Sequence, residues 1–248
     1  MELRQAVYEF YWRAKRIIAP SLKYSQYAYE EVLEKSVGSN TRWLDLGCGH
    51  HILPEWRNEQ EQRLVSRCKS VTGLDYDLDS LLKPSIISKK VRGEVSHLPF
   101  KSHSFDLVTA NMVVEHLEHP EIEFTEVNRI LEPGGRFIFH TPNALGHPSI
   151  MTRMVPDRIK NQLAYLLDGR PPGDIFKTHF KANTRKRIDA VARANGFEVQ
   201  EIKLIVSEAV FMAIPPLAVP ELFYLRLLMT QPLETFRTNI IAALVKCQ

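Results

Sequence analysis

The stretch that decides the fold runs from residue 41 to residue 49 and reads Thr41-Arg42-Trp43-Leu44-Asp45-Leu46-Gly47-Cys48-Gly49. An apolar strand leads into a carboxylate, and two glycines follow at once. Glycine lets the backbone turn sharply and lets a ligand approach closer than any Cβ would allow. Such a turn at the carboxyl end of a parallel strand is where open α/β sheets bind nucleotides. The stretch predicts a nucleotide-type turn, with a purely structural turn as the alternative.

The run from Trp43 to Gly49 resembles the first motif of class I S-adenosylmethionine-dependent methyltransferases. A dehydrogenase would instead carry three glycines at G-x-G-x-x-G spacing and its acid on the next strand. The resemblance implies that S-adenosylmethionine is the cofactor and that its methionine end is held by Asp45, Leu46, Gly47, Cys48 and Gly49. The chain departs from the family at His51, where a third glycine is usual, and this departure bears on cofactor affinity.

The composition is that of an ordinary globular protein. A chain of 248 residues with 44% hydrophobic and 25% charged residues fits one large α/β domain or two small ones. The net charge of +3 is too small to indicate a nucleic-acid partner. Three scattered cysteines without C-x-x-C spacing disfavour disulfides and structural zinc. With no signal-peptide pattern and no uninterrupted apolar span, we expect a soluble, cytoplasmic protein.

The order of the expected elements alternates strands with helices. Strands are expected at residues 41–46, 71–75, 90–92, 105–111, 136–140, 197–206 and 239–246, and helices at 3–18, up to 35, 53–68, 121–131, 151–170 and 184–195. This order predicts an α/β fold with a Rossmann-like, doubly wound sheet of seven strands. The sheet would be mostly parallel with an antiparallel last strand and with helices on both faces. We expect one domain over 1–248, with a helical cap (1–36), a cofactor-binding core (40–143) and substrate-side and C-terminal elements (144–248).

Asp75 ends the second expected strand, where a carboxylate can accept hydrogen bonds from both ribose hydroxyls. The alternative role is a helix N-cap, for which Asp77 and Asp79 compete. Tyr76 directly follows this strand, and Asn111 ends the fourth one. We expect both residues to contribute to the cofactor site.

A second resemblance covers Gly93 to Phe100, which is similar to the adenine-binding segment of the same family. It implies that Glu94 accepts a hydrogen bond from the adenine amino group and that Val95 packs on the ring. A loop acid in solvent is the alternative for Glu94. The run from 105 to 143 resembles the small-molecule branch of the family, including the ubiquinone- and menaquinone-pathway type, so that the motifs together cover about residues 40 to 143.

The expected function is therefore methyl transfer to oxygen, carbon or nitrogen of a small, lipophilic acceptor. A non-catalytic S-adenosylmethionine-binding module is the alternative, and an aminopropyl transferase is disfavoured because no acid-rich site for a polycation is evident. Methylation of amino groups on nucleic-acid bases is disfavoured too. Such enzymes usually show Asn/Asp-Pro-Pro-aromatic after strand four, and this chain has Asn111-Met112-Val113-Val114.

Three histidines are candidates for a catalytic base near neutral pH, namely His140, His179 and His116. His140 ends strand five, His116 follows strand four, and His179 lies in the loop before the 184–195 helix. Each could instead be a structural histidine, and an ionised acceptor would need no base. The pair His116 and His119 lacks H-E-x-x-H spacing, so we expect no metal site.

Two apolar segments have open roles. Residues 3–18 form an amphipathic, partly basic helix, for which packing on the domain is favoured over a lid or a contact with a membrane surface. The proline-containing segment 209–229 is expected to pack against the domain, with the wall of a lipophilic pocket as the alternative.

Overall fold

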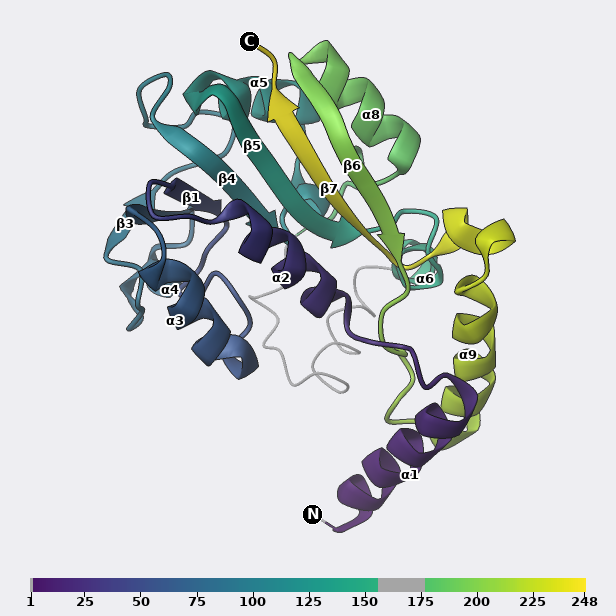
Figure 1. Ribbon diagram of the computed structural model, residues 1–248. Helices are drawn as coiled ribbons and strands as arrows, with labels where there is room; N and C mark the ends of the chain where they lie inside the picture. Colours follow the sequence, from purple (N-terminus) through teal and green to yellow (C-terminus); the bar gives the residue numbers. More distant parts are fainter. Residues whose placement is uncertain (1, 156–176) are drawn as a thin grey trace. The chain divides into compact units, whose positions relative to one another are not determined.

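The computed structural model describes residues 2–155 and 177–248 and contains a seven-stranded sheet in the order β3-β2-β1-β4-β5-β7-β6 (Figure 1). Strand β7 runs opposite to its neighbours β5 and β6. The predicted fold class is confirmed. The strands are β1 (Arg42–Leu46), β2 (Ser70–Asp75), β3 (Lys89–Arg92), β4 (Phe105–Asn111), β5 (Leu131–Pro142), β6 (Phe197–Ile205) and β7 (Asn239–Lys246).

The helices between the strands follow the expected alternation. The α-helices are α1 (Glu2–Ile18), α2 (Ser25–Ser36), α3 (Asn58–Ser66), α4 (Leu78–Leu82), α5 (Pro120–Ile130), α6 (His147–Met154), α8 (Arg185–Ala194) and α9 (Pro215–Leu228). Among residues 2–155 and 177–248, three short 3₁₀ turns accompany them, η1 (Glu55–Arg57), η2 (Val114–His116) and η4 (Gln231–Phe236).

The parallel pairing of the central strands brings the functional residues to one edge. Strand β1 pairs in parallel with β2 and with β4, and β4 pairs in parallel with β5. Leu46 lies beside Leu74 and Ala110 in this register, while Asn111 lies beside His140. The glycine turn, Asp75, Asn111 and His140 therefore all lie at the carboxyl edge, where open α/β sheets bind ligands.

Helices cover both faces of the sheet because successive side chains of a strand point to opposite sides. On β5, the rings of Phe137 and Phe139 pack edge-on or nearly so against Phe124 of α5, at 5.3 and 5.9 Å between centroids. On the opposite face His140 stacks on Tyr29 of α2 at 5.6 Å. These alternating contacts fix α5 and α2 on opposite sides of the sheet.

Several element boundaries differ from the sequence-based expectation. The helix expected over 53–68 begins only at Asn58, after the 3₁₀ turn η1. Strand β5 begins at Leu131 rather than at 136, because Leu131 already pairs with Phe105 before a bulge that precedes the Arg136 pairing with Leu107. Of the helix expected over 151–170, the structure shows α6, which ends at Met154; residues 156–176, including the loop expected at 171–174, lie outside the described residues.

The apolar segment 209–229 contains one continuous helix, α9, although Pro220 lies inside it. Pro215 and Pro216 occupy its first turn, where a missing N–H costs nothing. Pro220 removes one hydrogen bond to the carbonyl of Pro216, but both prolines are exposed, so that water can reach this carbonyl. The interior proline thus does not end the helix. No helix among the described residues is long and apolar enough to cross a membrane.

The chain divides into two compact units, so the single domain expected from the sequence remains a prediction. The first unit comprises residues 1–27, 142–177 and 204–240, and the second comprises 28–141, 178–203 and 241–248. The second unit holds most of the sheet and all the residues predicted for the site.

In the first unit, α1 and α9 share an apolar core. The buried members include Tyr11, Ile18, Leu22, Ala218, Leu222 and Leu225. Glu208 ties α1 to this core, because it accepts hydrogen bonds from the Tyr11 hydroxyl at 2.6 Å and from Lys15 Nζ at 2.7 Å. These contacts pack α1 on elements of its own unit, and its expected packing on the domain stays a prediction.

Candidate functional site

The turn after β1 strongly favours glycine at position 47. Gly47 has φ of +66°, and its amide donates to the carbonyl of Leu74 at 2.7 Å. A Cβ built on Gly47 would lie 2.4 Å from Cγ2 of Val113. The next amide, that of Cys48, donates to the same carbonyl at 3.2 Å. The backbone of this turn is therefore held close to β2 and to the segment that follows β4.

Asp75 fixes the second half of the turn from the end of β2. Its Oδ2 accepts a hydrogen bond from the amide of Gly49 at 2.8 Å, and its Oδ1 accepts one from the amide of Asp77 at 2.9 Å. Each carboxylate oxygen has a further lone pair for an incoming hydroxyl. The N-cap role weighed for this region belongs to Asp77, which caps α4. Tyr76 is 51% exposed and offers a ring beside Asp75.

Asp45 lies below the turn, in a buried polar cluster. It is 2% exposed, and its Oδ1 accepts a 2.5 Å hydrogen bond from the Thr109 hydroxyl, which itself accepts one from Trp43 Nε1 at 2.6 Å. Burial raises the pKa of Asp45, and the nearby carboxylates of Glu61 and Asp75 raise it further. Burial thus disfavours the charged form of Asp45, and a cationic group placed beside the carboxylate would stabilise that form.

Leu46 precedes Gly47, Cys48 lies between the two glycines, and both side chains are buried. Burial raises the pKa of the Cys48 thiol, so this side chain stays protonated at neutral pH. The contribution of these two residues to a ligand site is then limited to their backbone and to packing.

His51 stands where the third glycine of the family is usual, and Glu61, an acid on α3, holds this part of the turn. Glu61 is fully buried and contacts His51 Nδ1 at 3.2 Å, while its other oxygen accepts from the amide of Ile52 at 3.2 Å. Among the described residues, His50, His51 and Glu55 place ligand atoms within 4.8 Å of one another. Because Glu55 is largely exposed and paired with His50 at 3.5 Å, we keep the expectation of no metal as a prediction.

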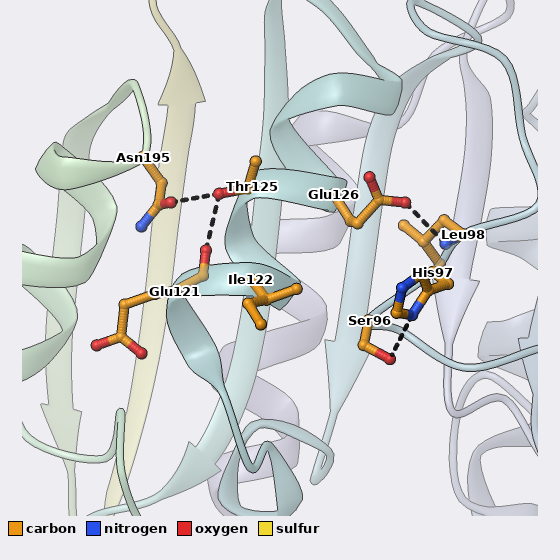
Figure 2. A pocket seen from close by; sticks show the side chains of 8 residues that line it. All are labelled: Ser96, His97, Leu98, Glu121, Ile122, Thr125, Glu126 and Asn195. Carbon is orange, nitrogen blue, oxygen red and sulfur yellow. Dashed lines mark hydrogen bonds between the residues drawn. The ribbon is translucent and has the colours of Figure 1, made fainter.

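The segment expected to bind adenine is anchored by α5. Glu126 accepts from the amide of Leu98 at 2.8 Å, as Figure 2 shows, and Arg129 donates to the carbonyls of Leu98 and Phe100 at 3.0 and 2.8 Å. Glu94 is exposed and Val95 is half-buried at the start of this segment. The anchored segment presents both residues beside the carboxyl edge.

An open hollow of about 650 Å³ lies on the α5 side of the same segment (Figure 2). It is lined by Ser96, His97, Leu98, Glu121, Ile122, Thr125, Glu126 and Asn195. None of the residues predicted to bind the cofactor lines this hollow. We therefore do not place the cofactor there.

The buried His140, near the end of β5, is paired with the half-buried Asn111 at the end of β4. His140 is 2% exposed, and its Nδ1 lies 2.9 Å from Asn111 Oδ1. Burial lowers the pKa of His140 to about 4, so the imidazole is neutral at physiological pH and Nδ1–H donates to the amide oxygen. A buried neutral histidine of low basicity is poorly suited to take a proton from an acceptor. These facts favour a structural role over the catalytic role considered for it.

Glu115, which was not among the candidates expected from the sequence, lies beside the side chain of His116 and accepts a hydrogen bond from the backbone of His179. His116 Nε2 lies 3.9 Å from Glu115 Oε1. The main-chain carbonyl of Glu115 accepts hydrogen bonds from the amides of His179 and Phe180 at 2.7 and 3.1 Å. The loop before α8 is thereby attached to the end of β4.

Glu115 is buried, and its carboxylate takes part in a series of hydrogen bonds between side chains. It is 4% exposed, its Oε2 accepts from the Thr141 hydroxyl at 2.9 Å, and Asn183 Nδ2 donates to that hydroxyl at 2.6 Å. Burial raises the pKa of Glu115, and the adjacent His116 opposes this shift. The position of Glu115 and Thr141 just after β4 and near the end of β5 is the sequence signal that could have indicated them.

These features lie together at the carboxyl edge of a Rossmann-like sheet, the edge where open α/β sheets bind ligands. Over residues 21–202 the chain matches the family described as methyltransferase domain, and it therefore belongs to this family. The resemblance to S-adenosylmethionine-dependent methyltransferases is confirmed. The cofactor that this membership implies, S-adenosylmethionine, fits a turn closed to any side chain at Gly47 and a carboxylate at the end of β2.

The chain is also similar to individual methyltransferases. It is 32% identical over 111 residues to the demethylmenaquinone methyltransferase of Lactiplantibacillus plantarum, a match that covers 41% of this chain and 45% of that protein. It is 27% identical over 169 residues to the ubiquinone biosynthesis O-methyltransferase of Citrobacter koseri, covering 61% and 67%. The chain thus spans less than half the length of the first of these relatives.

The fold is shared with solved structures of low sequence identity. An S-adenosylmethionine-dependent methyltransferase from Mesorhizobium loti superposes with a TM-score of 0.53 at 18% identity. The superposition covers 89% of this chain and 97% of that one. At this level of identity the comparison concerns the fold alone.

Proposed function

We propose that this chain transfers a methyl group from S-adenosylmethionine to a small, lipophilic acceptor. The observation that carries the proposal is the carboxyl edge of the sheet, where a glycine turn and Asp75 are joined by the Gly49–Asp75 hydrogen bond. The names of two relatives, which refer to demethylmenaquinone and to ubiquinone biosynthesis, support an acceptor of the quinone type. When bound, S-adenosylmethionine supplies an activated methyl group.

The residues of this chain would bind and orient the reactants. Asp75 would hold the ribose and Glu94 the adenine amino group, while Asp45 would face the ammonium group. Positioning alone contributes as much as about 7–11 kcal/mol to such a reaction. The chain needs a base only if its acceptor arrives protonated.

The test of the function is turnover. The chain should transfer labelled methyl groups from S-adenosylmethionine to hydroquinone- or phenol-type acceptors of low water solubility, with S-adenosylhomocysteine formed in equal amount. Labelling that appears only in nucleic acid, or binding of the cofactor without turnover of any extract fraction, would contradict the proposal.

Replacing Asp75 by alanine is expected to weaken S-adenosylmethionine binding by about 10- to 100-fold. The reason is the loss of a charge-assisted hydrogen bond to ribose, worth about 1.5–3 kcal/mol. Asp79→Ala removes an equal charge from the exposed start of α4 and is the matched control. Calorimetry measures the affinities, and thermal unfolding checks that both variants are folded. If the two variants bind equally well, Asp75 is not a cofactor ligand.

Of the three histidines, we propose His116 as the base for acceptors that need one. It is half-buried, and its Nε2 lies 3.9 Å from Oε1 of the buried Glu115. His116→Gln is expected to lower kcat by about 10²–10⁴-fold, the usual contribution of a general base. Glu115→Gln keeps the size of the neighbouring side chain and leaves the imidazole in place, so it should lower kcat less. An unchanged kcat in His116→Gln would show that His116 is not the base.

A further inference from the structure

The outward face of α9 is apolar over its whole length. Its exposed residues, apart from Arg226, are Pro216, Leu217, Pro220, Phe223, Tyr224 and Leu227. Phe223 and Leu227 are 55% and 57% exposed, and Leu217 is 46% exposed. The inward face of the same helix lies in the core shared with α1. A helix with large apolar side chains on both faces favours an apolar environment on its outward face as well.

The helix packed against α9 in the same unit adds an apolar and basic stripe. Phe10, Arg13 and Ile17 follow one another at helical spacing along α1, and all three are exposed, with Ile17 at 78%. Arg16 is exposed next to this stripe. Glu9 is the one acidic residue among the described side chains of α1. Lys15 is paired with Glu208, so its charge is compensated. The outer surface of α1 between residues 5 and 18 therefore carries a net positive charge.

The apolar and basic side chains of these two helices fit a lipid surface better than a protein partner. A protein interface usually forms about one hydrogen bond per 100–200 Å² of buried area, and prolines, leucines and phenylalanine offer no side-chain partner for one. The hydrocarbon of a lipid layer requires no hydrogen-bond partner. Arginines beside such a face complement anionic headgroups, and tryptophan and tyrosine favour the boundary between headgroups and acyl chains. Trp12 of α1 and Tyr224 of α9 are exposed, by 37% and 39%.

We propose that the α1–α9 pair docks on an anionic lipid surface, with Phe223 and Leu227 in the acyl boundary and with Arg13 and Arg16 at the headgroups. The helices lie on this surface and do not cross it. The proposal rests on the first compact unit alone and does not depend on methyl transfer.

The experiment is flotation of the full chain with vesicles. We expect binding to phosphatidylcholine vesicles that contain phosphatidylglycerol, and weaker, salt-insensitive binding to phosphatidylcholine alone. The Phe223→Ser, Leu227→Ser double variant should reduce bound protein by roughly tenfold or more, because buried apolar area drives insertion. Arg13→Gln with Arg16→Gln should remove the preference for phosphatidylglycerol. Ile122→Ser is the control, since Ile122 is 49% exposed on α5 in the other unit.

Two results would overturn the proposal. The first is that the wild-type chain fails to float with anionic vesicles, or that the serine double variant floats as well as wild type while thermal unfolding shows both to be folded. The second is that light scattering shows a stable dimer that the same double variant converts to monomers. In that case a second copy of the chain, rather than lipid, covers α9.

Discussion

Replacement of Gly47 by alanine is expected to abolish measurable S-adenosylmethionine binding, a loss of more than about 100-fold, or about 2.7 kcal/mol. Two causes add up. At φ of +66° a residue with a Cβ costs roughly 1–2 kcal/mol, and the new Cβ would lie 2.4 Å from Val113 Cγ2. Either Val113 or the turn must move, and the turn is attached to β2 through the Gly47 amide.

Gly49→Ala separates these two causes. Gly49 also has a positive φ, of +50°, but the nearest atom to its added Cβ is Ser80 Cβ at 3.9 Å. It should therefore show the strain without the clash and lose less affinity than Gly47→Ala. The double variant Gly47→Ala, Val113→Ala, which removes the clashing methyl groups, should regain part of the loss. Calorimetric titration measures all of these variants, and a Gly47→Ala protein that binds within about threefold of wild type would refute the assignment.

Asp45→Asn is expected to stabilise the free protein at neutral pH and yet to weaken cofactor binding. Burial raises the pKa of Asp45 in the folded state, so the folded state holds this proton more tightly than the unfolded state does. Wild-type stability from this group is therefore present below about pH 4 and is lost as the pH rises towards the raised folded-state pKa. Asparagine keeps an acceptor for the Thr109 hydroxyl and carries no charge, so its gain over wild type should grow with pH in this range.

The same variant should bind S-adenosylmethionine more weakly by about 1.5–3 kcal/mol, because the carboxylate would face the ammonium group. In the wild type, binding should also release a proton from Asp45 and strengthen as the pH rises. Thermal unfolding against pH and calorimetry in buffers of different ionisation enthalpy measure the two effects. A variant that is destabilised at neutral pH while its affinity is unchanged would make Asp45 a structural carboxylate only.

The sequence was sufficient for features that depend on one strand and its end. The glycine turn, Asp75 and Asn111 each end a recognisable strand, and parallel strands bring their carboxyl ends to one edge. The helix α9 was harder to foresee. Interior proline usually ends a helix, and its tolerance here depends on two exposed prolines and a packed inner face.

The protonation chemistry of the site could not be foreseen from the sequence. Glu115, Thr141 and Asn183 meet only through the pairing of β4 with β5 and the return of the loop before α8. Nothing in the sequence distinguishes the imidazole of His140 from that of His116. It is the packing of α2, which places Tyr29 over the ring, that buries His140 and lowers its pKa to about 4.

The most direct test of the account is a calorimetric titration of the purified wild-type chain with S-adenosylmethionine, S-adenosylhomocysteine and a nicotinamide dinucleotide. The arrangement of Gly47, Asp75 and Glu94 predicts saturable binding of both sulfur nucleosides, one per chain, and no heat of binding from the dinucleotide. Binding of the dinucleotide, or no binding of either nucleoside, would contradict it.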